Sequence, residues 1–78
     1  MWHIQKLNTI NAHDFYEILK LRIDTFVVSQ NRIYHELDEN DKHAFHIYLQ
    51  DENKQILAYG RVFLNNDHLT FGRIVTHD

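Results

Sequence analysis

The side chains best suited to chemistry are four carboxylates between positions 36 and 41, those of Glu36, Asp38, Glu39 and Asp41. Carboxylates at this density attract cations, so a binding wall for a cationic ligand is one interpretation of the run. Calcium fits poorly, because the run lacks the central Gly and the terminal bidentate Glu of an EF-hand loop. The ordinary structure for such a run is a solvated loop, and we expect one here.

Histidine and nucleophile chemistry have weaker support. His43 and His46 are three residues apart, so in one strand they lie on opposite faces and do not converge on a metal ion. The chain has no Cys, and its only Ser, Ser29, does not lie in a Gly-x-Ser-x-Gly motif. We therefore expect no serine or cysteine nucleophile and no zinc site, with a histidine-based metal binder as the weakest alternative.

Hydrophobic periodicity predicts the elements that position these side chains. Residues 2–7 alternate apolar and polar, as in a strand with one buried face. Residues 12–25 form an amphipathic helix, and residues 27–42 connect it to the rest of the chain. The apolar stripe expected on the helix comprises Phe15, Ile18, Leu19, Ile23 and Phe26. Three further strands, joined by polar turns, are expected at residues 45–50, 55–64 and 69–76.

The strand at residues 55–64 predicts a sheet that needs cover on both sides. Alternation puts Ile56, Ala58, Val62 and Leu64 on one face and Leu57, Tyr59 and Phe63 on the other. Both faces are apolar, which is typical of a central strand covered on two sides. One helix can cover only one side. We therefore expect either part of a larger domain or an association module that forms a homodimer through its uncovered face.

The composition is that of a small, weakly acidic protein. Seventy-eight residues form one domain at most, and without Cys no disulfide can stabilise it. The net charge of −3 gives no electrostatic reason to bind nucleic acid or an anionic membrane. The sequence has neither a signal peptide nor an apolar run of about 18 residues, so we expect a cytoplasmic location.

A longer order of residues links the helix, the connection and the later strands. It comprises Leu21-Arg22, Phe26-Val27-Val28, Gln30, Tyr34, the acidic run, His46, Ala58, Arg61 and Gly72-Arg73-Ile74-Val75. This order resembles the ElaA-like branch of the GNAT N-acetyltransferases. Ser29 and Ile33 depart from the pattern of that branch, in which Glu and Pro are usual.

The resemblance implies an α+β fold of β-α-β-β-β order, the N-terminal half of a GNAT-type fold with a mainly antiparallel sheet. It also implies transfer of an acetyl group from acetyl-coenzyme A to a small-molecule or peptide amine. The backbone of Ile74, Val75 and Thr76 corresponds to the strand end that pairs with the pantetheine arm. The residues implied on the acceptor side are Arg22, Phe26, Gln30, Tyr34, His46 and Arg73. Of these, His46 corresponds to an orienting hydrogen-bond partner or a base relay.

The phosphate-binding loop of that family does not occur in the sequence. The family holds the pyrophosphate with an Arg/Gln-x-x-Gly-x-Gly/Ala loop at a helix N-terminus, where free N–H groups favour an anion. The two glycines here, Gly60 and Gly72, fall inside predicted strands. We therefore expect residues 1–78 to be a single partial domain without the coenzyme loop and the C-terminal half. Such a chain alone should bind acetyl-coenzyme A weakly and be inactive.

Overall fold

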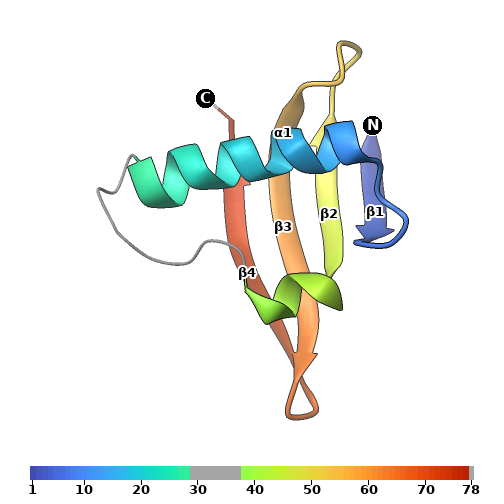
Figure 1. Ribbon diagram of the computed structural model, residues 1–78, viewed down its shortest axis with the longest axis vertical. Coiled ribbons are helices and arrows are strands. Elements are labelled where there is room, and N and C mark those ends of the chain that lie inside the picture. The colour runs from blue at the N-terminus through green and yellow to red at the C-terminus, as the bar shows by residue number, and fades with distance from the viewer. Residues whose placement is uncertain (29–37, 78) are drawn as a thin grey trace.

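The computed structural model describes residues 1–28 and 38–77, which form one four-stranded sheet with helical segments (Figure 1). In chain order the elements are β1 (Trp2–Lys6), α1 (Ala12–Ile23), η1 (Asp24–Val28), η2 (Glu39–Lys42), β2 (Phe45–Gln50), β3 (Ile56–Asn65) and β4 (His68–Thr76). η1 is a π-helical turn that continues α1, and η2 is a short 3₁₀ helix. Figure 1 shows α1 and η2 in front of the same face of the sheet.

The sheet is antiparallel throughout, and its strands follow one another in the order β1-β2-β3-β4. The predicted α+β fold and its β-α-β-β-β order are therefore confirmed. The turn between β3 and β4 was predicted from its residue types. Asn66 and Asp67 both have positive φ, 51° and 66°, as a two-residue type I′ hairpin turn requires.

Helix α1 begins where the sequence predicts, because Asn11 caps it. The Asn11 side-chain oxygen accepts a hydrogen bond from the backbone N–H of Asp14 at 2.8 Å. The side chains that α1 buries are, however, Asp14, Ile18 and Arg22. Ile23, which we predicted in the apolar stripe, is 41% exposed. The predicted stripe is therefore partly wrong, because two of the three residues facing the sheet are charged.

The apolar core lies between α1 and the sheet. It comprises Ile18, Tyr48, Ile56, Tyr59 and Val75, with Ile10, Leu21 and Phe26 packed against it. Two of its five members are tyrosines, so hydroxyl groups enter the protein interior together with apolar surface. Buried hydroxyl groups need hydrogen-bond partners, so the polar side chains around this core are required for its stability.

Two β-bulges shift strand faces away from the predicted alternation. One lies in β3, where Leu57 is the extra residue opposite Leu49 and Gln50 of β2, and the other lies in β4, opposite Tyr59 to Arg61 of β3. Ile56, predicted to share a face with Ala58, Val62 and Leu64, is instead buried beneath α1 together with Tyr59. That prediction was wrong because an extra residue in one strand reverses the faces of the residues beyond it.

Strand β4 departs from the predicted alternation for the same reason. Strict alternation puts Phe71 and Val75 on one face, but Phe71 is 68% exposed and Val75 is 6% exposed. Between them Arg73 has a φ of 53°, in the left-handed region. Gly60 of β3 therefore faces two residues of β4, which is the geometry of a bulge.

The face of the sheet away from α1 remains apolar and exposed in the described chain. Its large side chains, which we call the open face, are those of Trp2, Ile4, Phe45, Leu64, Leu69, Phe71 and Ile74, and each is 45–68% exposed. A groove of about 360 Å³ lies on this face and includes Trp2, Gly60 and Ile74 in its lining. The prediction of an uncovered sheet face is thus confirmed, although the residues of β3 on it differ from those predicted.

Candidate functional site

A buried carboxylate joins α1, η2 and β3 at the centre of the molecule. Arg22 of α1 donates two hydrogen bonds to Asp41 of η2, from Nη1 to Oδ1 at 2.9 Å and from Nη2 to Oδ2 at 3.2 Å. Arg61 of β3 donates a third, from Nη1 to the same Oδ1 at 2.9 Å. Arg22 is 0%, Asp41 2% and Arg61 4% exposed. Charged groups this deeply buried are stable only when paired, so each depends on the other two.

Asp38 extends this arrangement to β4. Arg61 donates to Asp38 from Nη1 at 2.8 Å and from Nη2 at 3.0 Å. Arg73 of β4 lies 3.5 Å from Asp38, between Nη2 and Oδ2. We call Arg22, Asp38, Asp41, Arg61 and Arg73 the ion cluster. It connects the helix, the 3₁₀ turn and two neighbouring strands through charged groups alone.

Asp38 and Asp41 of the acidic run therefore do not lie in the solvated loop that the sequence predicts. Asp38 and Asp41 form a capping box at η2: Asp38 accepts from the Asn40 N–H at 3.0 Å, and Asp41 accepts from the Asp38 N–H at 3.1 Å. Glu39 behaves as predicted, since its exposed side chain pairs with exposed Lys42 at 2.8 Å. Glu36 lies outside the described residues. The three-residue spacing of Asp38 and Asp41 was the signal that could have revealed the cap.

The pKa values of both cluster carboxylates lie below the ordinary value. At Asp38 the hydrogen bond from Arg61 is the main cause, and it outweighs desolvation. At Asp41 burial is the largest influence and would raise the pKa, but the hydrogen bonds and charges of Arg22 and Arg61 reverse it. Both groups stay ionised at neutral pH. Their stabilising effect is present above the unfolded carboxylate pKa of about 4 and is lost as the pH falls through the lowered folded values.

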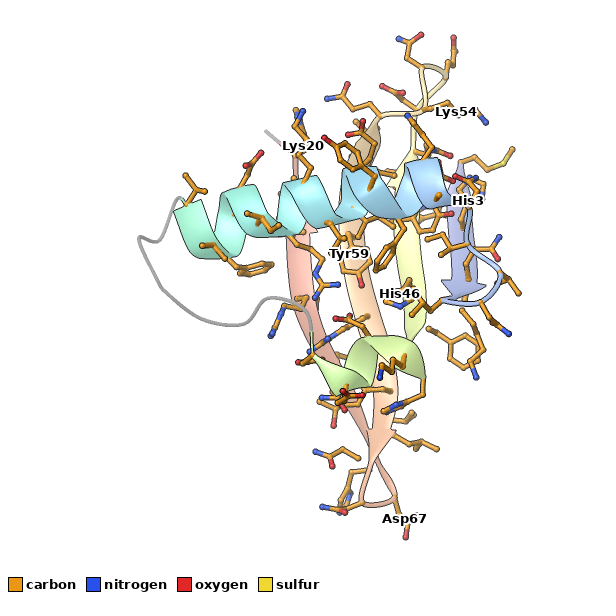
Figure 2. All side chains as sticks on the ribbon, viewed as in Figure 1. His3, Lys20, His46, Lys54, Tyr59 and Asp67 are labelled. Atoms are coloured by element: carbon orange, nitrogen blue, oxygen red, sulfur yellow. The ribbon has the colours of Figure 1, made fainter. Side chains whose placement is uncertain are left out.

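His46 and Tyr59 contact the ion cluster, and Figure 2 shows both below α1. The Nε2 atom of His46 lies 3.0 Å from the backbone oxygen of Asp41, and its Nδ1 atom lies 2.6 Å from the Tyr59 hydroxyl. A carbonyl oxygen can only accept, so Nε2 must carry the hydrogen. Nδ1 of the neutral ring then accepts from Tyr59. This fixes both the tautomer and the orientation of a histidine that is 0% exposed.

Burial dominates the titration of this pair. It lowers the pKa of His46, with the charges of Arg22 and Arg61 acting in the same direction, although the Asp41 carbonyl and charge oppose it. Burial also raises the pKa of Tyr59. His46 is therefore neutral at pH 7 and Tyr59 keeps its proton. Neither Arg22 nor His46 reaches the surface, so neither can contact a ligand there. Arg22 instead fixes the Asp41 carboxylate, and His46 orients the Tyr59 hydroxyl.

A second polar cluster, which the sequence analysis missed, ties the start of α1 to β2. Asp14 accepts hydrogen bonds from the Tyr48 hydroxyl at 3.2 Å and from the Gln50 side-chain nitrogen at 2.8 Å. Burial would raise the pKa of Asp14, but the hydrogen bonds from Gln50, Tyr48 and Asn11 lower it. Burial and the Asp14 charge raise the pKa of Tyr48 to about 12. This cluster fixes one end of the helix, and the ion cluster fixes the other.

The residues implied for the acceptor side fall into three groups. Arg22, His46 and Arg73 belong to the ion cluster or touch it, and so the fold brings them together. Phe26 is half-buried and packs against the apolar core. Gln30 and Tyr34 lie outside the described residues.

The residues implied for coenzyme binding alternate across the end of β4. Ile74 is 68% exposed beside the groove on the open face, and Val75 is 6% exposed in the core. Thr76 is exposed at the end of the strand.

Among residues 1–28 and 38–77, no group of three or more His, Cys, Asp or Glu could hold a metal ion. None of the helices in those residues is long and apolar enough to cross a membrane.

Two curated relatives match nearly the whole chain. UPF0039 protein sll0451 of Synechocystis sp. is 33% identical over an alignment of 78 positions, which covers 96% of this chain and 51% of that protein. A UPF0039 protein of Schizosaccharomyces pombe is 33% identical over 69 residues, 87% of this chain and 46% of that protein. The chain thus spans about half the length of the curated relatives that it matches. No protein-family profile matches it.

Solved structures give the decisive comparison. A crystal structure of an acyl-CoA N-acyltransferase from Pseudomonas aeruginosa superposes with a TM-score of 0.88 at 28% identity, over 99% of this chain and 56% of that one. The chain has a GNAT-type half fold. The crystal structure of Escherichia coli ElaA agrees, with a TM-score of 0.87 at 27% identity over 97% of this chain and 54% of that one. The resemblance that the sequence suggested is confirmed.

The buried histidine of this GNAT half fold makes its stability depend on pH near neutrality. The unfolded chain takes up a proton on His46 below about pH 6.5, whereas the folded chain, with its lowered pKa, does so only at lower pH. We expect His46 to reduce the unfolding free energy by about 1.4 kcal/mol for each pH unit between those two values. Urea unfolding at a series of pH values between 7 and 5 measures this slope.

The matched variants are His46→Gln, whose amide can still donate to the Asp41 carbonyl, and His68→Gln at an exposed position. His46→Gln should lose part of the slope, and His68→Gln should keep it. A slope that is the same in the wild type and in His46→Gln contradicts the assignment of a buried neutral imidazole.

Proposed function

We propose that this chain supplies one half of an N-acyltransferase that moves an acetyl group from acetyl-coenzyme A to the amine of a small molecule or peptide. The observation that carries the proposal is the match of nearly the whole chain, in sequence and in fold, to an acyl-CoA N-acyltransferase and to ElaA. We propose a cytoplasmic location together with this function. The net charge of −3 is compatible with a cationic acceptor.

The coenzyme side of the proposal depends on the end of β4. Within the described sheet β4 is an edge strand, so one side of its backbone has no neighbouring strand among the described residues. Such an edge can pair with an extended ligand, because its free N–H and C=O groups repeat along the strand. We assign this role to the backbone of Ile74, Val75 and Thr76. The amide groups of a pantetheine arm are the matching chemistry.

The pyrophosphate anchor is proposed to come from outside the described residues. Gly60 lies within β3 and Gly72 within β4, so neither opens a loop before a helix N-terminus. A coenzyme held only along its pantetheine arm loses the charge-assisted contacts that its phosphates can make. We therefore propose that residues 1–78 form a partial domain that binds acetyl-coenzyme A weakly and does not turn it over alone.

The acceptor side is proposed to include Phe26 and Arg73, and the resemblance also implies Gln30 and Tyr34, which lie outside the described residues. Arg73 is the member of the ion cluster that β4 contributes, and its side chain retains 22% exposure. Arg22 and His46 have no exposure, so their proposed role is to hold neighbouring groups of the acceptor side in place. Arg22 does so by fixing Asp41, and the neutral imidazole of His46 does so by accepting a hydrogen bond from the Tyr59 hydroxyl.

A chimera tests this function directly. Residues 1–77 of this chain are joined to the half of Escherichia coli ElaA that the chain does not match, and the product is incubated with acetyl-coenzyme A and a panel of amines. We expect acetylated amines by mass spectrometry and release of the coenzyme thiol. Residues 1–78 alone should give neither product.

The control for the chimera is Thr76→Pro, which removes one backbone N–H from the proposed pantetheine-binding edge. The loss of one hydrogen bond of about 1.4 kcal/mol predicts a rise of about tenfold in the KM for acetyl-coenzyme A. Activity of ElaA itself in the same assay, with no transfer by a folded chimera on any amine, contradicts the proposed function.

A second candidate function is a non-catalytic module that forms a homodimer through the open face. The observation that favours it is the seven large apolar side chains there, each 45–68% exposed. Monomeric proteins rarely leave an apolar patch above a few hundred Å² in water. Two such faces can pack against each other as the sheets of a sandwich do, about 10 Å apart. The opposite face cannot serve, because α1 and η2 cover it.

Light scattering over a concentration series tests the dimer. The association module predicts a dimer whose dissociation constant rises at least about tenfold in Phe71→Lys, since a charge must then leave water. Tyr16→Lys is the matched control, because Tyr16 is 64% exposed on α1, away from the open face. A folded wild-type chain that stays monomeric at the highest concentrations excludes this second function.

A further inference from the structure

Arg73 stands at a break in β4 that its residue type alone does not explain. Arg61 pairs with Gly72 and Tyr59 pairs with Val75, so Gly60 faces both Arg73 and Ile74. Arg73 has a φ of 53°, and a residue other than Gly loses about 1–2 kcal/mol in this left-handed region. Some interaction of Arg73 must therefore offset that loss.

The ion cluster provides a fixed partner for the Arg73 side chain. Asp38 accepts two hydrogen bonds from Arg61 and one from the Asn40 backbone, so contacts other than the one with Arg73 already fix its carboxylate. Arg73 Nη2 lies 3.5 Å from Asp38 Oδ2. The charge of Arg73 also contributes to the lowered pKa of Asp38, as expected for an attractive pair.

The bulge determines on which face of the sheet Arg73 lies. Phe71 lies on the open face, so strict alternation would put Arg73 there too, with Ile74 toward α1. That arrangement would set a guanidinium among apolar side chains and remove it from Asp38. The extra residue instead lets Arg73 reach Asp38 on the side of α1, and it returns Ile74 to the open face.

The same break decides the orientation of the three residues that follow. With the bulge, Val75 enters the core and is 6% exposed, and Ile74 lies beside the groove at 68% exposure. Without it, the two would exchange faces, since a shift of one residue turns every later side chain over. The N–H and C=O groups of these residues would also reverse, so those now pointing away from β3 would point toward it.

We propose that Arg73 is a positioning residue: its ion pair with Asp38 selects the bulged register of β4, and that register decides which backbone groups of Ile74, Val75 and Thr76 point away from β3 toward a pantetheine ligand. The ligand part of this inference rests on the proposed function, whereas the register part stands on the fold alone. Arg73 thereby links the buried ion cluster to the proposed coenzyme edge without touching the reacting atoms.

Nuclear magnetic resonance on the full isotope-labelled chain tests the register. In the wild type, cross-strand contacts should join Tyr59 to Val75, and the backbone coupling constant of residue 73 should report positive φ. Arg73→Lys should keep both signals. Arg73→Glu, which repels Asp38, should lose the Tyr59–Val75 contacts and gain contacts between Tyr59 and Ile74, while the contacts between Ile4 and Ile47 stay unchanged.

Arg73→Gly separates the side chain from the backbone. Gly adopts positive φ without penalty, so this variant should retain the bulged register as one of two registers in exchange, whereas Arg73→Glu should not. Wild-type Tyr59–Val75 contacts at full intensity in Arg73→Glu overturn the proposal. If Arg73→Glu does not fold, Arg73→Met carries the test, and an undivided bulged register in that neutral variant overturns it equally.

Titration with coenzyme A, followed by the amide signals of residues 74–76, separates this inference from the proposed function. Both are supported if coenzyme A shifts these signals in the wild type and its dissociation constant rises at least about tenfold in Arg73→Glu. If the register changes in Arg73→Glu but coenzyme A shifts no signal in the ElaA chimera, the proposed function fails and the role of Arg73 in selecting the register stands.

Discussion

The structure depends on one buried carboxylate that accepts hydrogen bonds from two guanidinium groups. Asp41 is 2% exposed and lies between Arg22 and Arg61, which are themselves almost fully buried. Removing one partner from such a group leaves an uncompensated charge in the protein interior, at a typical loss of about 3–5 kcal/mol. The helix, the 3₁₀ turn and the third strand therefore have to meet at this point.

The other groups of the proposed site are positioned by contacts with this carboxylate or with its neighbours. The Asp41 carbonyl fixes the tautomer of His46, and the ring in turn orients Tyr59 within the core. On the other side Asp38 extends the charges to Arg73 and so to the register of β4. The buried polar groups thus determine where the backbone of a strand edge points, and a strand edge is the feature that the proposed acyltransferase function needs.

Local signals in the sequence predicted the elements well. Asn11 and the pair Asn66 and Asp67 act within a few residues of their own positions, so the helix start and the last hairpin were visible in the sequence. The order of residues between Leu21 and His46 also identified the correct fold family. An alternating pattern such as Phe45 to Gln50 needs only the backbone period of two, and β2 was predicted at its observed bounds.

The contacts that shape the site act over longer distances and were not predictable in the same way. Arg22 and Asp41 are 19 residues apart, and nothing in the pattern of apolar residues distinguishes them from solvated charges. The bulge at Arg73 depends on a carboxylate from another segment, so strict alternation gave the wrong faces in β4. Apolar periodicity marks buried apolar side chains only, so it does not reveal a polar network buried beneath a helix.

A double-mutant cycle on Arg22 and Asp41 tests the central claim most directly. Urea unfolding of the wild type, Arg22→Gln, Asp41→Asn and the double variant, all in the same concentration of a stabilising osmolyte, gives the coupling free energy of the pair. The structure predicts a coupling of about 1–3 kcal/mol, with the double variant less destabilised than the sum of the single variants. Two single effects that add within about 0.5 kcal/mol would mean that the pair does not hold α1 and η2 together.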